Sequence, residues 1–407
     1  MNVQGHTITS TADVEIPKRL IDQIIGQDQA VEVVRIAARQ RRFLLIVGEP
    51  GTGKSLLGQA VAEMFDKQPL QDVLALPNFQ EAVLPKVQVC VAGEATALVQ
   101  QAKYLRRRAL STESFILWTL ALSTLCLVLY FAIRDNSPTW ILGGVFVLFL
   151  IYQGRKALFS HSGKNIPKIL ISNSQEKVPF IDATGSQAGA LLGDVRHDPF
   201  QSGGHESSPH SLLEAGAIHR AHNGVLFIDE VSTLGMDSQH SLLTAIQQKE
   251  LAIFGRSPGS SGTMVRSENV PCDFLLILAG NVGDIDNMHP ALRSRVRGYG
   301  YEIFTNTEMA DTERNRSKLI QFIAQEVKCD GKIPHFDLSA IEAIIAAARK
   351  RASQDNMLTT KLRELGGLVR AAGDLAVQLE DKLVSKKHVE LAHKYARSLE
   401  EQQDSLC

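Results

Sequence analysis

Short apolar runs, separated by polar and glycine-rich segments, divide the chain into alternating strands and helices. Three runs, Phe43–Val47, Val225–Ile228 and Phe274–Leu278, contain only apolar residues and predict buried parallel strands. A helical pattern precedes the first run, from about Pro17 to Arg42. This alternation predicts an α/β fold built on a parallel sheet.

Weaker patterns add further elements. Two short strands are predicted at Ile169–Ile171 and Phe180–Ile181, and a helix is predicted from Ser208, an N-cap before a first-turn proline, to Gly224. The pattern is helical from Asp337 onward, with predicted helices at Ser339–Arg351, Thr360–Leu383 and Lys386–Glu400. The chain is therefore expected to end in an all-helical domain.

The most uneven stretch is Phe115–Ile133, which is 19 residues long and carries no charge. As a helix it would reach about 28 Å, close to the ~30 Å hydrocarbon core of a bilayer. A second span is predicted at 137–154. A buried hairpin in a soluble core is the alternative, but core helices are rarely apolar all round. The sequence thus favours a two-helix transmembrane hairpin.

Basic residues flank this hairpin on both sides. Lys103 and Arg106–Arg108 precede it, Arg155 and Lys156 follow it, and the connector carries only Arg134 beside Asp135. By the positive-inside rule, both termini are expected in the cytoplasm of a two-span protein of the cell membrane. A role in topology or at lipid headgroups explains the arginine run better than nucleic-acid binding does.

Composition adds a few limits. The chain has 407 residues, enough for two or three domains. Its 43 Lys and Arg against 44 Asp and Glu give a net charge of -1, so no global field attracts nucleic acid. The five cysteines form no CxxC pair, which argues against a disulfide framework or a cysteine-rich zinc site.

The octapeptide after the first predicted strand matches the phosphate-binding pattern GxxxxGK[ST] in full. Its residues are Gly48, Glu49, Pro50, Gly51, Thr52, Gly53, Lys54 and Ser55. Glycines let backbone N–H groups surround phosphates, Lys54 supplies a charge to them, and Ser55 offers its hydroxyl to Mg²⁺. The motif predicts a site for ATP and Mg²⁺.

A second motif lies at the end of the strand Val225–Ile228, where Asp229 and Glu230 follow directly. Asp229 is expected to hold Mg²⁺, and Glu230 is expected to polarise the attacking water. A solvated acidic turn is the alternative, and the presence of the phosphate loop argues against it.

Together with Ile277–Asn281 and Arg293-Ser294-Arg295, these motifs resemble those of an AAA+ ATPase. The resemblance implies that Asn281 senses the γ-phosphate and that Arg295, or else Arg293, acts on the site of a neighbouring subunit. Leu362-Arg363-Glu364-Leu365 resembles the lid motif, so Arg363 would reach the nucleotide. Ile25-Gly26-Gln27 weakly resembles the adenine-side segment.

The inserted hairpin and the segments Asp182–Gly185, Gly193–Pro199 and Glu214–His219 are similar to the ATPase part of the archaeal-type, membrane-anchored Lon protease. Gln247–Phe274 matches the hairpin before the sensing strand, which magnesium-chelatase-type subunits share. The resemblance covers about residues 15 to 405. It implies a homo-oligomer, expected to be a hexameric ring, acting on unfolded or membrane protein substrates.

The fold implied is a P-loop AAA+ three-layer sandwich interrupted by the transmembrane hairpin and followed by an all-α lid. The expected divisions are 1–110, 111–158, 159–310 and 311–407. The chain ends at Cys407, 44 residues beyond Arg363, which leaves no room for the Ser–Lys protease domain of that family. The protease would be cut away or a separate polypeptide, or the chain would be a stand-alone remodeller or scaffold. A magnesium-chelatase-like ATPase is the other alternative, and the hydrophobic hairpin argues against it.

Two weaker hypotheses concern residues 194–222. Phe200, in a Gly- and Ser-rich loop, is a candidate for the aromatic residue that grips substrate in the pore, although an aromatic packed under a loop is as well supported. A group of histidines could hold a metal, but their spacing matches no zinc template: His197, His205, His210, His219 and His222.

Overall fold

The computed structural model describes residues 9–65, 69–134, 166–173, 177–196, 208–256 and 264–395, the backbone of 2–3 and 6–7, and parts of 140–153. The predictions for the loop around Phe200 and for most of the second predicted span, 137–154, fall outside these residues.

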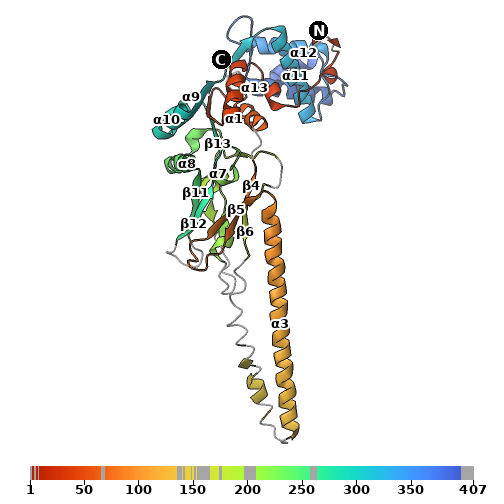
Figure 1. The fold of residues 1–407 in the computed structure, drawn as a ribbon. Helices are drawn as coiled ribbons and strands as arrows, with labels where there is room; N and C mark the ends of the chain where they lie inside the picture. The colour runs from red at the N-terminus through yellow and green to blue at the C-terminus, as the bar shows by residue number, and fades with distance from the viewer. Residues whose placement is uncertain are drawn as a thin grey trace, which may run out of the picture.

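A five-stranded parallel sheet forms the centre of the molecule (Figure 1). Its strands are β3 (Phe43–Val47), β7 (Phe180–Asp182), β10 (Val225–Ile228), β13 (Leu275–Gly280) and β14 (Gly300–Phe304). They lie side by side in the order β14-β3-β13-β10-β7, so the first strand is flanked by the last two. The three apolar runs are thus confirmed as buried parallel strands.

Helices cover both faces of this sheet, because successive strand residues point to opposite sides. Leu44 and Ile46 pack with α1 (Asp28–Gln40) and α2 (Lys54–Met64) on one face. Leu45 and Val47 pack on the other face with three helices, α7 (Ala217–Arg220), α8 (Met236–Gln248) and α10 (Pro290–Tyr299). The result is an α/β fold with three layers.

A second, antiparallel sheet carries the long insertion. It consists of β4 (Gln71–Leu76) between β5 (Lys86–Val91) and β6 (Lys168–Ile171), and only β6 was predicted. Next to it lies the predicted hairpin, β11 (Glu250–Arg256) and β12 (Met264–Pro271). Arg266 N donates to Val83 O at 3.0 Å, which joins this hairpin to the segment before β5.

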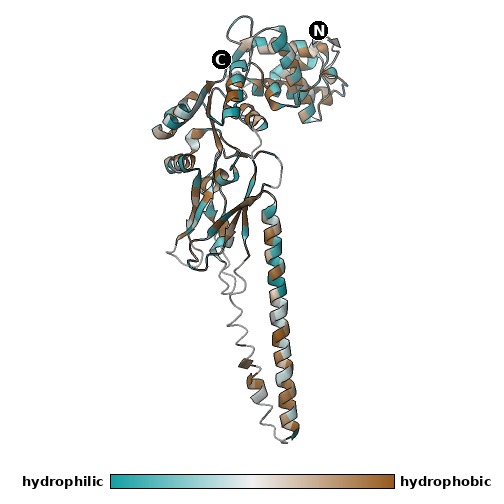
Figure 2. Cartoon of the chain, viewed as in Figure 1, coloured by the Kyte–Doolittle hydropathy of each residue, from teal (hydrophilic) through white to brown (hydrophobic). Residues whose placement is uncertain are grey.

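The first predicted span lies within α3 (Glu94–Arg134), a single helix of 41 residues. At 1.5 Å per residue it is about 60 Å long, and it projects from the body (Figure 1). Among the described residues it is the one helix long and apolar enough to cross a membrane, and none of its apolar window is buried. Its distal half is the hydrophobic part (Figure 2), so within this chain it is not a core helix.

Both ends of the insertion meet at Asp72 of β4, whose side chain is fully buried. Its Oδ2 accepts hydrogen bonds from Gly93 N (2.8 Å) and Ala95 N (3.3 Å), at the start of α3. Its Oδ1 accepts one from Asn173 N (2.7 Å), just after β6. One carboxylate therefore caps the long helix and fixes the returning strand beside it.

The C-terminal helical region contains α11 (Glu313–Asp330), α12 (Leu338–Lys350), α13 (Leu362–Gln378) and α14 (Lys386–Tyr395) around one core. It is not purely helical, because β15 (Glu308–Ala310) pairs with β16 (Met357–Thr359) at its base. This ribbon places the start of α13 beside the central sheet.

Two predicted helices are confirmed only in part. The segment 17–42 contains a 3₁₀ turn, Leu20–Gln23, and α1 begins only at Asp28, because Gly26 adopts a left-handed φ of 69°. The segment 208–224 breaks into α6 (Pro209–Leu212), β9 (Leu213–Glu214) and α7. A side chain at Gly216 would lie 2.3 Å from Gly193 N, so the chain turns there against β8 (Asp194–Val195).

The remaining elements are short. They are β1 (Asn2–Val3), β2 (His6–Thr7), α5 (Ala188–Leu192), α9 (Val282–Asp286) and the 3₁₀ turns Thr11–Asp13 and Val231–Thr233.

Candidate nucleotide site

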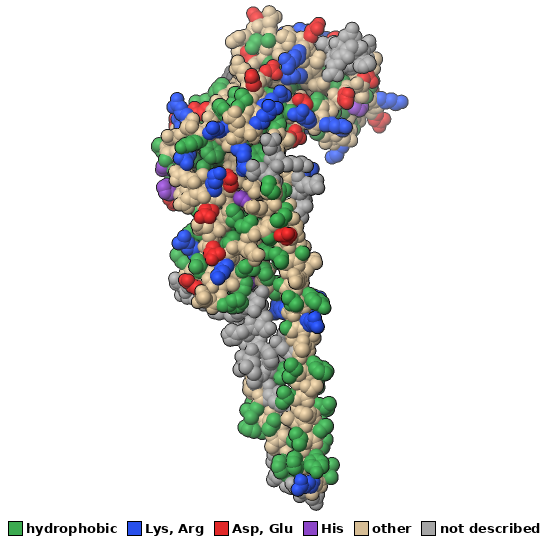
Figure 3. All heavy atoms as spheres, viewed as in Figure 1, with side chains coloured by type: hydrophobic (Ala, Val, Ile, Leu, Met, Phe, Trp, Pro, Cys, Tyr) green, Lys and Arg blue, Asp and Glu red, His purple; other side chains and the backbone are tan. Residues whose placement is uncertain are grey.

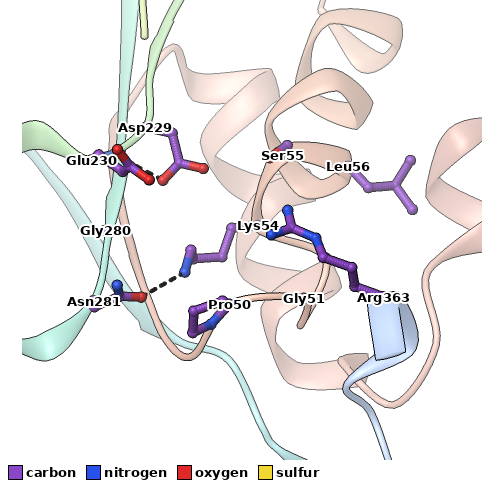
Figure 4. Close-up of a pocket in the computed structure, with 11 residues that line it drawn as sticks. Pro50, Gly51, Lys54, Ser55, Leu56, Asp229, Glu230, Gly280, Asn281 and Arg363 are labelled. Carbon is purple, nitrogen blue, oxygen red and sulfur yellow. Dashed lines mark hydrogen bonds between the residues drawn. The ribbon is translucent and has the colours of Figure 1, made fainter. Parts of the chain in front are cut away.

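A pocket of about 270 Å³ lies at the carboxyl ends of β3, β10 and β13. Parallel strands of an α/β sheet end at the same edge, which is where such folds bind ligands. The lining residues are Pro50, Gly51, Gly53, Lys54, Ser55, Leu56, Asp229, Glu230, Gly280, Asn281 and Arg363 (Figure 4). Nine predicted site residues line it, and the other three residues of the predicted octapeptide, Gly48, Glu49 and Thr52, are not part of the lining.

The loop between β3 and α2 has the backbone geometry of an anion cradle. Gly51 and Gly53 have φ values of 85° and 88°, which disfavour any side chain. Gly48 leaves no space either, because a Cβ there would lie 1.7 Å from Thr305 Oγ1. Thr52 and Thr305 share a hydrogen bond of 2.7 Å, which anchors the loop to the residue after β14. The free N–H groups of α2 therefore open into the pocket.

The Lys54 side chain crosses the pocket. Its Nζ donates to Gly48 O (2.6 Å), to Glu49 O (3.2 Å) and to Asn281 Oδ1 (3.1 Å). Burial lowers the pKa of its ammonium below the ordinary value, and the nearby Asp229 carboxylate acts in the opposite direction. A poorly hydrated cation held by carbonyl oxygens would gain strongly from an anionic partner.

Asp229 and Glu230 follow β10 in a constrained turn. Asp229 N donates to Thr184 Oγ1 (2.9 Å), and Glu230 N donates to Asp229 Oδ1 (2.9 Å). Glu230 has a left-handed φ of 52°, a conformation that costs a residue with a side chain about 1–3 kcal/mol. Two hydrogen bonds from Thr233 to Glu230 O, each 2.8 Å long, hold it there. Strain of this kind is typical of catalytic turns.

Asp284 is a residue that the sequence analysis missed. Its Oδ2 accepts from Asn281 N (2.7 Å), and its Oδ1 accepts from Ser232 Oγ (2.7 Å). It therefore links the residue after β13 to the turn that carries Glu230. The signal was present, since an acid three residues after Asn281 is a capping-box pattern.

The helical region closes one side of the pocket. Arg363 points in from the start of α13, and Leu362 N donates to Gly51 O at 3.1 Å (Figure 4). Lys361, also missed from the sequence, pairs with Glu49 through Nζ and Oε2 at 2.6 Å. Gln27 bonds to both backbone groups of Asn306 (2.7 and 2.8 Å), and its Nε2 lies 3.5 Å from Thr52 O, so the segment Ile25-Gly26-Gln27 lies next to the phosphate loop.

Arg295 does not line the pocket of its own chain. It lies on α10, where its guanidinium sits 4.4 Å from the centroid of the Tyr299 ring, and its Nε is buried with no hydrogen-bond partner among the described residues. Arg293, the second choice, lies 4.0 Å from Glu302 in an ion pair.

The described histidines serve as structural hydrogen-bonding groups. His219 accepts from Gly216 N through Nδ1, so its Nε2 donates to Leu251 O (3.0 Å), and burial lowers its pKa to about 4. His210 lies 2.9 Å from Ile166 O, and His222 accepts from Asp273 N. Within the described residues no group of three or more His, Cys, Asp or Glu side chains could hold a metal.

Comparison with known proteins finds long relatives. The chain is 49% identical to the archaeal Lon protease of Archaeoglobus fulgidus over 399 residues, and it is also 49% identical to that of Thermococcus kodakarensis. These matches cover 98% of the chain but only 63% and 62% of the relatives, so the chain spans less than two thirds of their length.

A shorter relative decides the family. A Lon protease homologue of Thermoplasma volcanium is 37% identical over 448 residues, which cover 96% of the chain and 90% of that protein. The chain belongs to the Lon protease family. Parts of this Lon family chain also match two other sequence profiles: the Sigma-54 interaction domain at residues 202–266, and magnesium chelatase, subunit ChlI, at residues 20–91.

Solved structures are more distant from this Lon family chain. NtrX from Brucella abortus in complex with ATP superposes with a TM-score of 0.42 at 13% identity, covering 97% of this chain and 60% of that one.

The pocket of the Lon family chain has the groups that ATP and Mg²⁺ require. Mg²⁺ in nucleotide sites takes one or two protein oxygens together with substrate phosphates, and Ser55 and Asp229 both line the pocket. The desolvated Lys54 and the α2 N-terminus suit the phosphates. These residues therefore fit the pair.

Proposed function

We propose that this chain is the membrane-anchored, ATP-hydrolysing motor of a Lon-type ATP-dependent protease. The observation that carries the proposal is the convergence of Lys54, Asp229, Asn281 and Arg363, from four separate segments, on one pocket. A glycine-rich turn that arose by chance would not be expected to share a pocket with an acidic pair, an amide and an arginine.

Each side chain would have one role. The backbone of Gly48–Gly53 and the Lys54 ammonium would bind the phosphates of ATP, and Ser55 and Asp229 would hold Mg²⁺, which offsets phosphate charge. Glu230 would accept a proton from the attacking water, and Asn281 would orient that water. Arg363 would bind the phosphates from its position in the helical region. Hydrolysis would then change the angle between the helical region and the central sheet.

The site would be completed by a second copy of the chain. Arg295 lies outside its own pocket, and its buried Nε has no described hydrogen-bond partner. A guanidinium supplied by a neighbour would stabilise charge on the transferred phosphoryl group. Head-to-tail contacts of this kind can close into a ring, and we propose that the ring is a hexamer.

The membrane part of the proposal depends on α3. Hydrophobic side chains cover its distal half, and basic side chains lie above them toward the body (Figure 3). Two contacts support a second span packed against it: Trp140 stacks on Phe131 at 4.9 Å, and a Cβ on Gly144 would lie 2.5 Å from Val128. We therefore propose two spans, with the ATPase body in the cytoplasm.

Extraction of membranes tests the anchor. The intact chain should remain in the pellet after alkaline carbonate treatment, and a chain with residues 111–158 replaced by a Gly/Ser linker should be released. Release of the intact chain would contradict the proposed spans.

ATP turnover tests the mechanism. Glu230→Gln should bind ATP as the wild type does but hydrolyse it at least ~100-fold more slowly, because general-base catalysis contributes about 10²–10⁴-fold. Glu342→Gln, on the exposed face of α12, is the matched control and should hydrolyse at the wild-type rate. Equal rates for Glu230→Gln and wild type would refute the assigned role.

The proposed substrates are unfolded or membrane proteins, threaded through the ring. Because the Lon relatives are longer than this chain, proteolysis is proposed only in association with a protease domain. Stimulation of ATP turnover by an unfolded protein supports a motor, and stimulation by DNA alone would oppose it.

A further inference from the structure

A second pocket, of about 320 Å³, lies within the helical region. It is bounded by α12, β16, α13 and α14 and is lined by Ala347, Lys350, Arg351, Thr359, Lys361, Glu364 and His393. Its volume is at the lower end for ligand pockets, which suits a small molecule. None of the roles proposed above for the nucleotide site uses it.

The charge of this pocket is strongly one-sided. Three permanent cations, Lys350, Arg351 and Lys361, face a single carboxylate, Glu364. Lys361 has a partner, Glu49, but Lys350 and Arg351 form no ion pair within the part of the chain that the structure describes. Like charges in one pocket repel each other, so a favourable interaction with negative charge must offset this repulsion.

The dipole of helix α12 supplies part of this favourable interaction. Lys350 and Arg351 lie at the carboxyl end of α12, and the negative end of a helix dipole favours cations. This effect does not account for Arg351 Nη1, which is buried and has no hydrogen-bond partner among the described residues. A buried guanidinium N–H without an acceptor is destabilising, so an acceptor is missing from the set described.

We propose that this pocket binds a small phosphate-bearing anion. The Arg351 fork would donate hydrogen bonds to two phosphate oxygens side by side, and Lys350 would add a point charge. The hydroxyl of Thr359 accepts from Lys361 N (3.1 Å), which leaves its proton available to a further oxygen. The donors in the pocket therefore suit a ligand that is an oxyanion with several acceptor oxygens.

The bound anion would act on the nucleotide site through Lys361. This side chain lines the pocket, and its Nζ holds Glu49 of the phosphate loop at 2.6 Å. An anion in the pocket competes with Glu49 for that ammonium, so it loosens the ion pair between the helical region and the loop.

Binding can be measured without ATP turnover, so the test stands apart from the proposed ATPase. Equilibrium dialysis with radiolabelled inorganic phosphate uses the full chain in detergent, saturated with a non-hydrolysable ATP analogue and Mg²⁺ to fill the first pocket. Saturable binding of one phosphate per chain is expected. Its Kd should rise at least tenfold in Arg351→Gln and in Lys350→Gln, the latter an exposed position whose change should not disturb the fold.

Lys387→Gln, an exposed lysine on α14 outside the pocket, is the matched control and should leave the Kd within twofold of wild type. The proposal is overturned if the saturated chain binds no phosphate, if both pocket variants bind it as wild type does, or if Lys387→Gln weakens it equally.

Discussion

The Asp72 carboxylate is expected to set how rigidly the long helix is mounted on the body. Asp72→Asn tests this because the amide has the same shape but only one acceptor oxygen. Both oxygens of Asp72 accept hydrogen bonds from backbone N–H groups. Oδ2 accepts from Gly93 and Ala95, and Oδ1 accepts from Asn173. In the variant, an NH₂ group must face at least one of these donors.

The magnitude follows from that mismatch. A buried donor deprived of its acceptor costs about 1–3 kcal/mol, and loss of an N-cap alone costs about 0.5–2 kcal/mol. Because 1.36 kcal/mol corresponds to a factor of ten, a local cost of about 1–3 kcal/mol should speed amide exchange roughly 5- to 150-fold.

Hydrogen–deuterium exchange read by mass spectrometry is the assay. Peptides covering residues 91–97 and 171–175 should exchange faster in Asp72→Asn, and those from the nucleotide pocket should not change. ATP turnover in detergent should stay within twofold, because Asp72 does not line that pocket. Asp355→Asn, in an exposed turn, is the control and should exchange as wild type does. Unchanged exchange at both peptides in folded Asp72→Asn would refute the reasoning.

Three further outcomes are expected. Asp284→Asn should slow ATP turnover by about tenfold with little effect on ATP binding, because it disturbs positioning rather than the phosphate contacts; an unchanged rate constant would contradict the link. Arg295→Ala should lose ~10³-fold in turnover and regain activity when mixed with Glu230→Gln chains, whereas Arg293→Ala should stay within threefold; equal losses would remove the distinction. The pKa of His219 is lowered to about 4, so the unfolded chain binds more protons and stability falls as pH drops from about 6.5 toward 4. Denaturant unfolding should show that the wild type loses about 2 kcal/mol more than His219→Gln between pH 7 and pH 5, and identical pH dependence would oppose this assignment.

Much of the pocket followed from local pattern. An apolar run ending in Gly48–Ser55, and another ending in Asp229 and Glu230, predicted residues at one sheet edge because parallel strands end together. The family was likewise apparent from motif order, and the relatives confirm it. Asp284 and Lys361 were missed because their importance depends on partners in other segments, Ser232 and Glu49.

The errors have a common cause in backbone packing. Gly26 and Gly216 interrupt helices that their apolar periodicity predicted, since close contacts with Thr360 and with the backbone at Gly193 leave no room for a side chain. The β4–β5 pair was missed because β5 is mostly exposed and shows no clear alternation. In each case tertiary contacts override a local signal.

The sequence by itself determined what depends on neighbours along the chain: the strands, the phosphate loop, the acidic pair and the uncharged stretch at 115–133. Apolar content and glycine spacing act locally, so they can be read without a fold. Only the tertiary structure decided that this stretch continues into a 41-residue helix capped by Asp72, and that Arg363 enters the pocket while Arg295 stays outside it. Those facts depend on which segments, far apart in the sequence, the sheet order brings together. A local pattern of residues does not encode these long-range contacts.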